Sequence, residues 1–359
     1  MTITINRVDT RLALASLEVA KSVAVVILAH DEAGVIESTV RSVCRVLDPQ
    51  DAVYVIADNC GDATADRAAG AGAYVRERLS GGPDGKGAAL KWFVDQAGDL
   101  LERYDLAVIL DADNQVPAGF MQDVKKSYIG EGILQCFVQP VGYQGSPLGT
   151  LIALSEIHEQ KTIDGLRARL GWPVRLRGTG MVMSPGMLKI VANMLDTEVE
   201  DIALSLLYSA RGIHVQKNMQ VCVYDPKPRE SILASRQRAR WFRGQWVAFW
   251  HYRRDVLALI RQGLPGWSLL SSLFLKPRWL LDLIMLGLAF ACAWFSWLLA
   301  ALFLSRVLFD LVCLGWTIFS SEDRKDYLIA ILHVPAFIFM WIRSFLLAFQ
   351  KSPWQRARQ

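Results

Sequence analysis

The sequence predicts an α/β domain of the mostly parallel, Rossmann-like kind, followed by transmembrane or interfacial helices at the carboxyl end. Two observations predict this fold. Short apolar runs rich in β-formers alternate with segments of helical spacing in the first third of the chain, as in βαβ units. Over residues 279–349 the composition then changes to mainly Leu, Ala, Phe, Ile and Trp, which is typical of membrane segments. A length of 359 residues allows both parts.

The first two strand and helix units place polar residues at a strand end. Residues 22–29, SVAVVILA, predict a buried strand, and residues 30–47 follow with helical spacing. Residues 52–57, AVYVIA, predict a second strand that runs into the cluster beginning at Asp58. The Asp58 carboxylate can accept a hydrogen bond from a nucleotide base. A turn with an N-cap for a helix near Thr64 explains the cluster equally well.

A glycine-rich loop follows the third expected strand, residues 73–79. Its sequence SGGPDGKG precedes a helix expected from about residue 88. Backbone N–H groups at a helix start favour anions, and Lys86 adds a positive charge there. The loop lacks the order of residues of a Walker A motif.

Two aspartates end the fourth expected strand. The run LAVIL at residues 106–110 leads directly into Asp111 and Asp113, which the sheet would present at its carboxyl edge. Carboxylate oxygens suit Mg²⁺ or Mn²⁺, and such an ion can bridge to substrate phosphates. The sequence therefore suggests a metal and a diphosphate, with a solvated turn as the plain alternative.

The motifs in this order resemble those of the family 2 glycosyltransferases. AHDE, ADNCGDAT, DGKGAAL and DAD follow successive strands, and RLRGTGMVMS and an E-D pair come later. QRARW fits the Q-x-x-R-W motif at every fixed position, as in the membrane-associated branch that includes cellulose, chitin and hyaluronan synthases. The resemblance covers residues 23–241 and implies a GT-A fold, a nucleotide-sugar donor and Mg²⁺ or Mn²⁺.

The resemblance also implies roles for the residues around the donor. Asp58 would contact the nucleotide, with Lys86 on the same side. Asp111 and Asp113 would hold the metal ion, with Asp113 the first choice for direct ligation. Arg240 would pair with the diphosphate through its planar guanidinium.

Other residues would serve the acceptor. Asp201 of the E-D pair would be the general base that takes the proton of the attacking hydroxyl. The residues expected to line the acceptor site are Gly178, Thr179, Gly180, Glu200, Gln237 and Trp241. Two simpler interpretations compete: Glu200 and Asp201 could complement a helix dipole, and the basic helix around Arg240 could lie against a membrane.

The chain divides into four expected parts. Residues 1–21 form a tail or amphipathic helix, 22–254 the glycosyltransferase domain, 255–278 an interfacial region, and 279–359 a transmembrane region with a basic tail. Lys and Arg flanking the apolar region put the catalytic domain in the cytoplasm of a multi-pass inner-membrane protein. Two full spans plus a re-entrant or interfacial carboxyl-terminal segment fit this pattern, with three full spans, against the positive-inside rule, as the alternative. The scattered cysteines suggest reduced thiols.

The expected function is that of a membrane-bound, metal-dependent inverting glycosyltransferase using a UDP-sugar or similar donor. A growing β-linked polysaccharide is the first expected acceptor, and single transfer to a lipid or lipid-linked acceptor is the rival. A non-catalytic regulatory homologue is the alternative of another class. The expected partners are the donor, the acceptor and membrane lipids, with an oligomer or an export partner to complete a polymer channel; the net charge of +4 gives no indication of nucleic acid.

Overall fold

The computed structural model describes residues 21–79, 85–130, 132–194, 200–227 and 231–349. The expected amino-terminal helix and the basic tail lie outside these residues. The strands are β1 (Val23–Ala29), β2 (Ala52–Asp58), β3 (Tyr74–Arg78), β4 (Leu106–Asp111), β5 (Ile133–Val141), β6 (Met181–Met183) and β7 (Val215–Pro226). They form one seven-stranded sheet in the order β3-β2-β1-β4-β6-β5-β7.

The sheet is mostly parallel, as the sequence predicts. β1 pairs in parallel with β2 and β4, β2 with β3, and β5 with β7. Among the paired strands only β6 runs antiparallel, between β4 and β5. Because the parallel strands run the same way, the ends of β2 and β4 reach one edge of the sheet.

Helices cover both faces of the sheet because its central strands are apolar on both sides. Alternate β1 residues, beginning with Val23, pack against α2 (Ile36–Cys44), α3 (Thr64–Gly70) and α5 (Phe120–Ser127). The others, beginning with Ala24, pack against α4, α8 and α9, which span Lys86–Leu101, Pro185–Met194 and Glu200–Ala210. α4 thus begins two residues before the predicted start.

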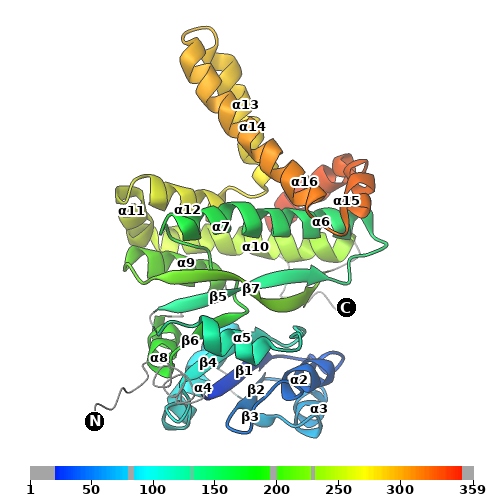
Figure 1. The fold of residues 1–359 in the computed structure, drawn as a ribbon, viewed down its shortest axis with the longest axis vertical. Helices are drawn as coiled ribbons and strands as arrows, with labels where there is room; N and C mark the ends of the chain where they lie inside the picture. Colours follow the sequence, from blue (N-terminus) through cyan, green and yellow to red (C-terminus); the bar gives the residue numbers. More distant parts are fainter. Residues whose placement is uncertain (1–20, 80–84, 131, 195–199, 228–230, 350–359) are drawn as a thin grey trace, which may run out of the picture.

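A second layer of helices lies across β5 and β7 (Figure 1). It contains α6 (Pro147–His158), the π-helical turn η1 (Glu159–Asp164), α7 (Gly165–Arg169), α10 (Ser231–His251), α11 (Arg253–Arg261) and α12 (Leu264–Phe274). A cluster of buried apolar side chains from α9, α10, α11 and α12 ties this layer to the sheet domain. Gly263 lies between α11 and α12, at the start of α12.

The remaining helices follow a proline. α13 (Arg278–Cys292) and α14 (Trp297–Phe319) form a hairpin that projects from the body, and α15 (Arg324–Ile331) and α16 (Val334–Ala348) pack on α6 and α10 (Figure 1). By length and composition, α14 is the one described helix that could cross a membrane alone. α15 and α16 would make a second only as a pair bent by 73°. α13 has 15 residues, fewer than the ~20 that a full span needs.

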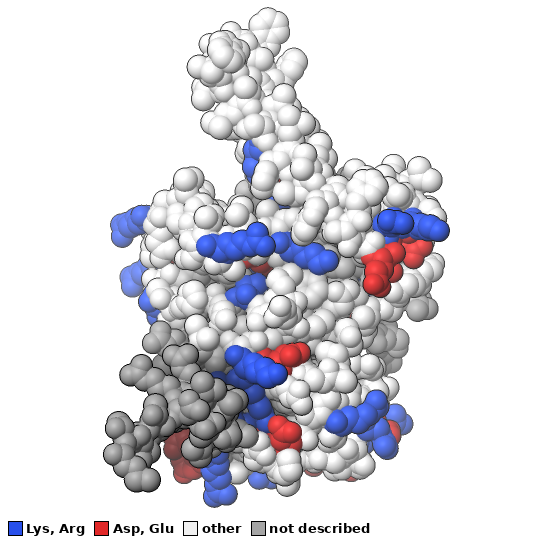
Figure 2. Space-filling model, viewed as in Figure 1, with Lys and Arg blue, Asp and Glu red and all other residues white. Residues whose placement is uncertain are grey.

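Charged residues that interrupt the apolar sequence are paired in the hairpin. Arg278 of α13 donates two hydrogen bonds to the Asp310 carboxylate of α14, at 2.7 and 2.9 Å. Arg306 lies 3.5 Å from Asp282. His158 of α6 hydrogen-bonds Thr317 of α14 and lies 3.6 Å from Asp310, so it joins the hairpin to the body. In Figure 2 the outer part of the hairpin shows no charged side chain, whereas Lys and Arg lie at its base and below.

Candidate active site

The expected nucleotide residue, Asp58, is engaged in a buried ion pair. It lies 6% exposed at the end of β2 and accepts a hydrogen bond from Arg78 at 2.6 Å. Arg78 is the residue opposite Asp58 in the register of β2 and β3. Asp62, and not Asp58, makes the turn before α3, because its carboxylate accepts the N–H of Thr64. Arg78 was missed by the sequence reasoning, since pairing register is not visible in a local pattern.

The two expected metal ligands, Asp111 and Asp113, form an acidic centre. Lys86 places a positive charge beside it. The Lys86 ammonium lies 2.6 Å from Asp111 Oδ1. Burial raises the pKa of Asp113 to about 7, and the nearby carboxylates of Asp225 and Asp111 add to this effect, which Lys86 opposes. Negative charge in excess of nearby positive charge, presented by hard oxygen donors, fits Mg²⁺ or Mn²⁺.

Asp225 is a further acidic residue that the sequence reasoning missed. It lies in β7, and its carboxylate accepts a hydrogen bond from Asn114 at 3.4 Å. Its other oxygen pairs with Lys227, which also lies 2.6 Å from Glu156 of α6. Its position near the end of β7 could have identified it as a site residue. The sequence, however, did not predict that β7 would place it beside Asn114.

The Gly178–Thr179–Gly180 segment is joined to the end of β4. The Thr179 hydroxyl donates to Asn114 Oδ1 and accepts the N–H of Asp111 at 3.2 Å. Gly178 and Gly180 have φ of +75° and +61°, and they let the chain turn closely at this point. The segment therefore fixes the backbone of the metal-binding candidate Asp111, a contact that its expected acceptor role does not require.

We expect Gly180→Ala to lower the free energy of unfolding by about 1–3 kcal/mol. A Cβ there would lie 3.2 Å from both Cys136 Cβ and Val223 Cγ2, in a left-handed backbone conformation. Urea unfolding would measure the change. Gly186→Ala is the matched control, because a Cβ there meets open space in a helix, and an equal loss in the control would contradict the prediction.

Asp201, the expected general base, lies at the start of α9 and is held by an arginine. Arg175 Nη2 lies 3.1 Å from Asp201 Oδ2. Arg175 is also 3.9 Å from Glu159 of η1, which in turn lies 3.1 Å from Lys276. The carboxylate of Glu159 remains ionised, because Lys276 and nearby arginines hold its pKa well below the usual value. The side chain of Glu200 lies outside the described set.

Loss of the Arg175 guanidinium is expected to lower kcat by about 10- to 100-fold, because the carboxylate of Asp201, the expected base, would no longer be held in one orientation. Arg175→Met would be compared with Arg175→Lys, which keeps a charge and should recover part of the rate. A purely structural role predicts a lower Tm in both variants without this partial recovery of kcat. The exposed Arg169→Met serves as the control and should leave kcat unchanged.

The Q-x-x-R-W residues lie on α10, away from these contacts. Arg240 is exposed, Gln237 and Trp241 are half-buried, and no hydrogen bond or ion pair among the described residues joins them to the aspartates. The buried arginine of this segment is Arg238, at an unspecified position of the motif, and its guanidinium lies 5.0 Å from the centroid of Trp341 of α16. Burial lowers the pKa of Arg238 to about 10. The proposed contact of Arg240 with a diphosphate stays a prediction.

Comparisons with known proteins agree with this architecture. Residues 20–244 match the model of the family described as glycosyltransferase like family 2. A mannosyltransferase from Pyrobaculum calidifontis, solved with GDP-mannose and Mn²⁺, has a TM-score of 0.51 and 18% identity over 88% of this chain and 87% of that one. Glucosyl-3-phosphoglycerate synthase from Mycobacterium tuberculosis has a TM-score of 0.40 and 19% identity over 64% and 76%.

None of the curated proteins compared with the chain matches it. At these identities the solved structures speak only for the fold, and the mannosyltransferase supports it with a TM-score above a half. The family match carries more weight, since it spans more than half of the chain. It also covers every expected site residue from Asp58 to Trp241. The chain therefore belongs to glycosyltransferase family 2, with a GT-A catalytic domain.

Proposed function

We propose that the protein is a metal-dependent, inverting glycosyltransferase that moves a sugar from a nucleotide donor to an acceptor at a membrane surface. The observation that carries the proposal is the segment from Arg175 to Thr179. At one end Arg175 pairs with Asp201, and at the other Thr179 bonds the backbone of Asp111. Four residues span at most about 14 Å, so the expected base and the expected metal site lie within reach of one substrate pair.

The donor would be a nucleoside diphosphate sugar, with a UDP-sugar as first choice. Asp111 and Asp113 would hold Mg²⁺ or Mn²⁺, which would offset charge on the diphosphate leaving group. The solved mannosyltransferase binds GDP-mannose with Mn²⁺, which supports a donor and an ion of this kind. Lys86 adds a positive charge beside Asp111.

In the proposed mechanism Asp201 accepts a proton, and Arg175 holds Asp201 in position. The acceptor hydroxyl loses its proton to Asp201 as its oxygen attacks the anomeric carbon from the face opposite the diphosphate, while the bond from that carbon to the diphosphate oxygen breaks and the nucleoside diphosphate leaves with the electron pair. Arg175 orients the Asp201 carboxylate for this step. Attack from that face inverts the anomeric configuration.

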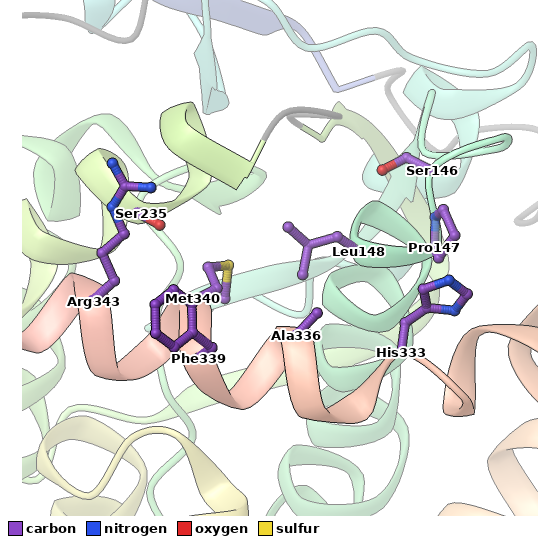
Figure 3. A pocket seen from close by; sticks show the side chains of 9 residues that line it. All are labelled: Ser146, Pro147, Leu148, Ser235, His333, Ala336, Phe339, Met340 and Arg343. Carbon is purple, nitrogen blue, oxygen red and sulfur yellow. The ribbon is translucent and has the colours of Figure 1, made fainter.

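A lipid or lipid-linked acceptor is supported by a cavity of about 430 Å³ between α6, α10 and α16. In Figure 3 its wall combines apolar side chains with a few polar ones: Ser146, Pro147, Leu148, Ser235, His333, Ala336, Phe339, Met340 and Arg343. Its apolar wall suits a hydrocarbon chain, and Arg343 suits an anionic head group. We therefore favour the transfer of one sugar to such an acceptor.

A β-linked polysaccharide acceptor is the second candidate, and the complete Q-x-x-R-W motif favours it. One described helix is long enough to cross a membrane alone, so a polymer channel would need an oligomer or an export partner. The proposal keeps the division into residues 22–254, 255–278 and 279–359, with the catalytic part in the cytoplasm.

A donor screen tests the proposal. Purified protein in nanodiscs would receive Mn²⁺ or Mg²⁺, a panel of UDP- and GDP-sugars, and lipid extract, with released nucleotide and product mass recorded. One sugar added to a lipid is the expected result, and high-mass product would favour the second candidate. Nucleotide binding without turnover of any donor would contradict both and favour a regulatory homologue.

A further inference from the structure

The α13–α14 hairpin has an apex of unusual composition. Residues 293–296 read Ala-Trp-Phe-Ser, and Trp294 and Phe295 are 79% and 90% exposed. Helices that cross a bilayer twice present a connecting loop to water on the far side, where polar residues are expected. This apex is instead as apolar as the helices that it joins.

Several backbone groups of the apex are hydrogen-bonded within the hairpin. The N–H groups of Phe295 and Ser296 donate to the carbonyl of Cys292, and the Ser296 hydroxyl accepts the N–H of Leu299. A chain reversal placed in hydrocarbon must meet its own hydrogen-bonding needs, because lipid offers no partners. These contacts make a reversal inside the lipid less costly.

Charges limit how deeply the hairpin can enter. Two ion pairs, Arg278 with Asp310 and Arg306 with Asp282, form a collar across the two helices. Beyond the collar α14 returns to the body, where Thr317 and Ile318 are buried against α6. The part between the collar and the apex is the part of the hairpin that can enter lipid without carrying a charged side chain, whereas the exposed apolar side chains Leu311 and Val312 of α14 lie on the body side of the collar.

That part is about half as long as a bilayer is thick. The uncharged stretches are residues 283–292 and 297–305, ten and nine residues. At 1.5 Å per residue they rise about 15 Å, whereas the hydrocarbon core measures about 30 Å. The hairpin would therefore end near the middle of the bilayer.

We propose that the α13–α14 hairpin enters only the cytoplasmic leaflet and returns without crossing the membrane. The proposal rests on the membrane association proposed above. Its occupant is a leaflet containing anionic lipid, because exposed basic side chains lie on the helices below the hairpin: Arg236, Arg240, Arg243, Arg253, Arg254, Arg261 and Arg343. Figure 2 shows Lys and Arg at the base of the uncharged projection.

Site-directed labelling distinguishes half-depth insertion from a full crossing. The full-length protein carrying Phe295→Cys would be exposed to a membrane-impermeant maleimide in intact spheroplasts and in inside-out vesicles, with labelling at residue 295 read by peptide mass spectrometry. We expect no labelling from either face and full labelling after detergent. Labelling in spheroplasts would overturn the proposal in favour of a crossing, and labelling in inside-out vesicles would show a hairpin outside the lipid.

Ser321→Cys is the matched control, because it precedes α15 on the body side and should label only in inside-out vesicles. Leu298→Cys repeats the test should the first variant fold poorly. A bimane on residue 295 should also be quenched more by nitroxides deep on the acyl chains than by nitroxides at the head group; the reverse order would contradict the proposal. Neither measurement depends on sugar transfer, so an inactive protein would not affect the outcome.

Discussion

Asp201→Asn is expected to lower kcat by about 10²- to 10⁴-fold, the usual contribution of a general base. Asparagine keeps the size of the side chain and can still face Arg175, but its amide cannot take a proton from the acceptor hydroxyl. Steady-state release of the nucleotide from the donor identified by the screen would measure the loss.

Two controls separate chemistry from folding in that experiment. The Kd of the nucleotide should stay within about twofold of the wild-type value, since the proposed donor contacts lie on elements other than α9. Asp255→Asn, on α11, removes a carboxylate outside the proposed site and should leave kcat unchanged. A kcat for Asp201→Asn within threefold of wild type would remove Asp201 from the role of base.

Asp113→Asn should remove metal-dependent turnover and lower kcat by about 10³-fold or more. A metal ion that stabilises the charge on the leaving group by several kcal/mol in the transition state accounts for a factor of this size. Calorimetry with Mn²⁺ and nucleotide, beside kcat, would test it. Asp95→Asn, an exposed carboxylate on α4, is the control. Metal binding of wild-type strength in the Asp113 variant would assign the ion to other ligands.

The acidity of Asp113 adds a dependence on pH. Its pKa is raised to about 7, so below pH 7 a proton occupies the carboxyl group and must leave before a cation can bind. Metal affinity should therefore fall as the pH falls through 7, by about tenfold per unit at lower pH, and should level off above about pH 8. In Asp113→Asn this slope should disappear. A wild-type affinity that does not change between pH 6 and 8 would contradict the assignment.

The parallel half of the sheet was predictable because its signals are local. Apolar runs fix β1, β2 and β4, and the handedness of the connections brings Asp58 and Asp111 to one edge. The partners of these carboxylates were not predictable. Arg78 faces Asp58 only through the register of β2 and β3, and Arg175 reaches Asp201 across 26 residues of sequence.

The carboxyl-terminal half depended more on tertiary packing. In QRARW the sequence singled out Arg240, whereas the structure buries Arg238 against Trp341, because α16 covers that side of α10. The helical spacing of a motif cannot say which of its faces a distant helix will cover. Likewise Asp282 and Asp310 interrupt the apolar pattern, and only the fold shows the arginines that neutralise them.

Successive ionic contacts join the foot of the hairpin to the proposed base. They run from Lys276 to Glu159, from Glu159 to Arg175, and from Arg175 to Asp201. Coupling free energies act equally in both directions. If the depth of the hairpin shifts Lys276, the orientation of Asp201 shifts with it, and an acceptor that fixes Asp201 must favour the same depth. The thickness and charge of the surrounding bilayer then become effectors of sugar transfer, and acceptor binding in turn becomes a determinant of membrane affinity.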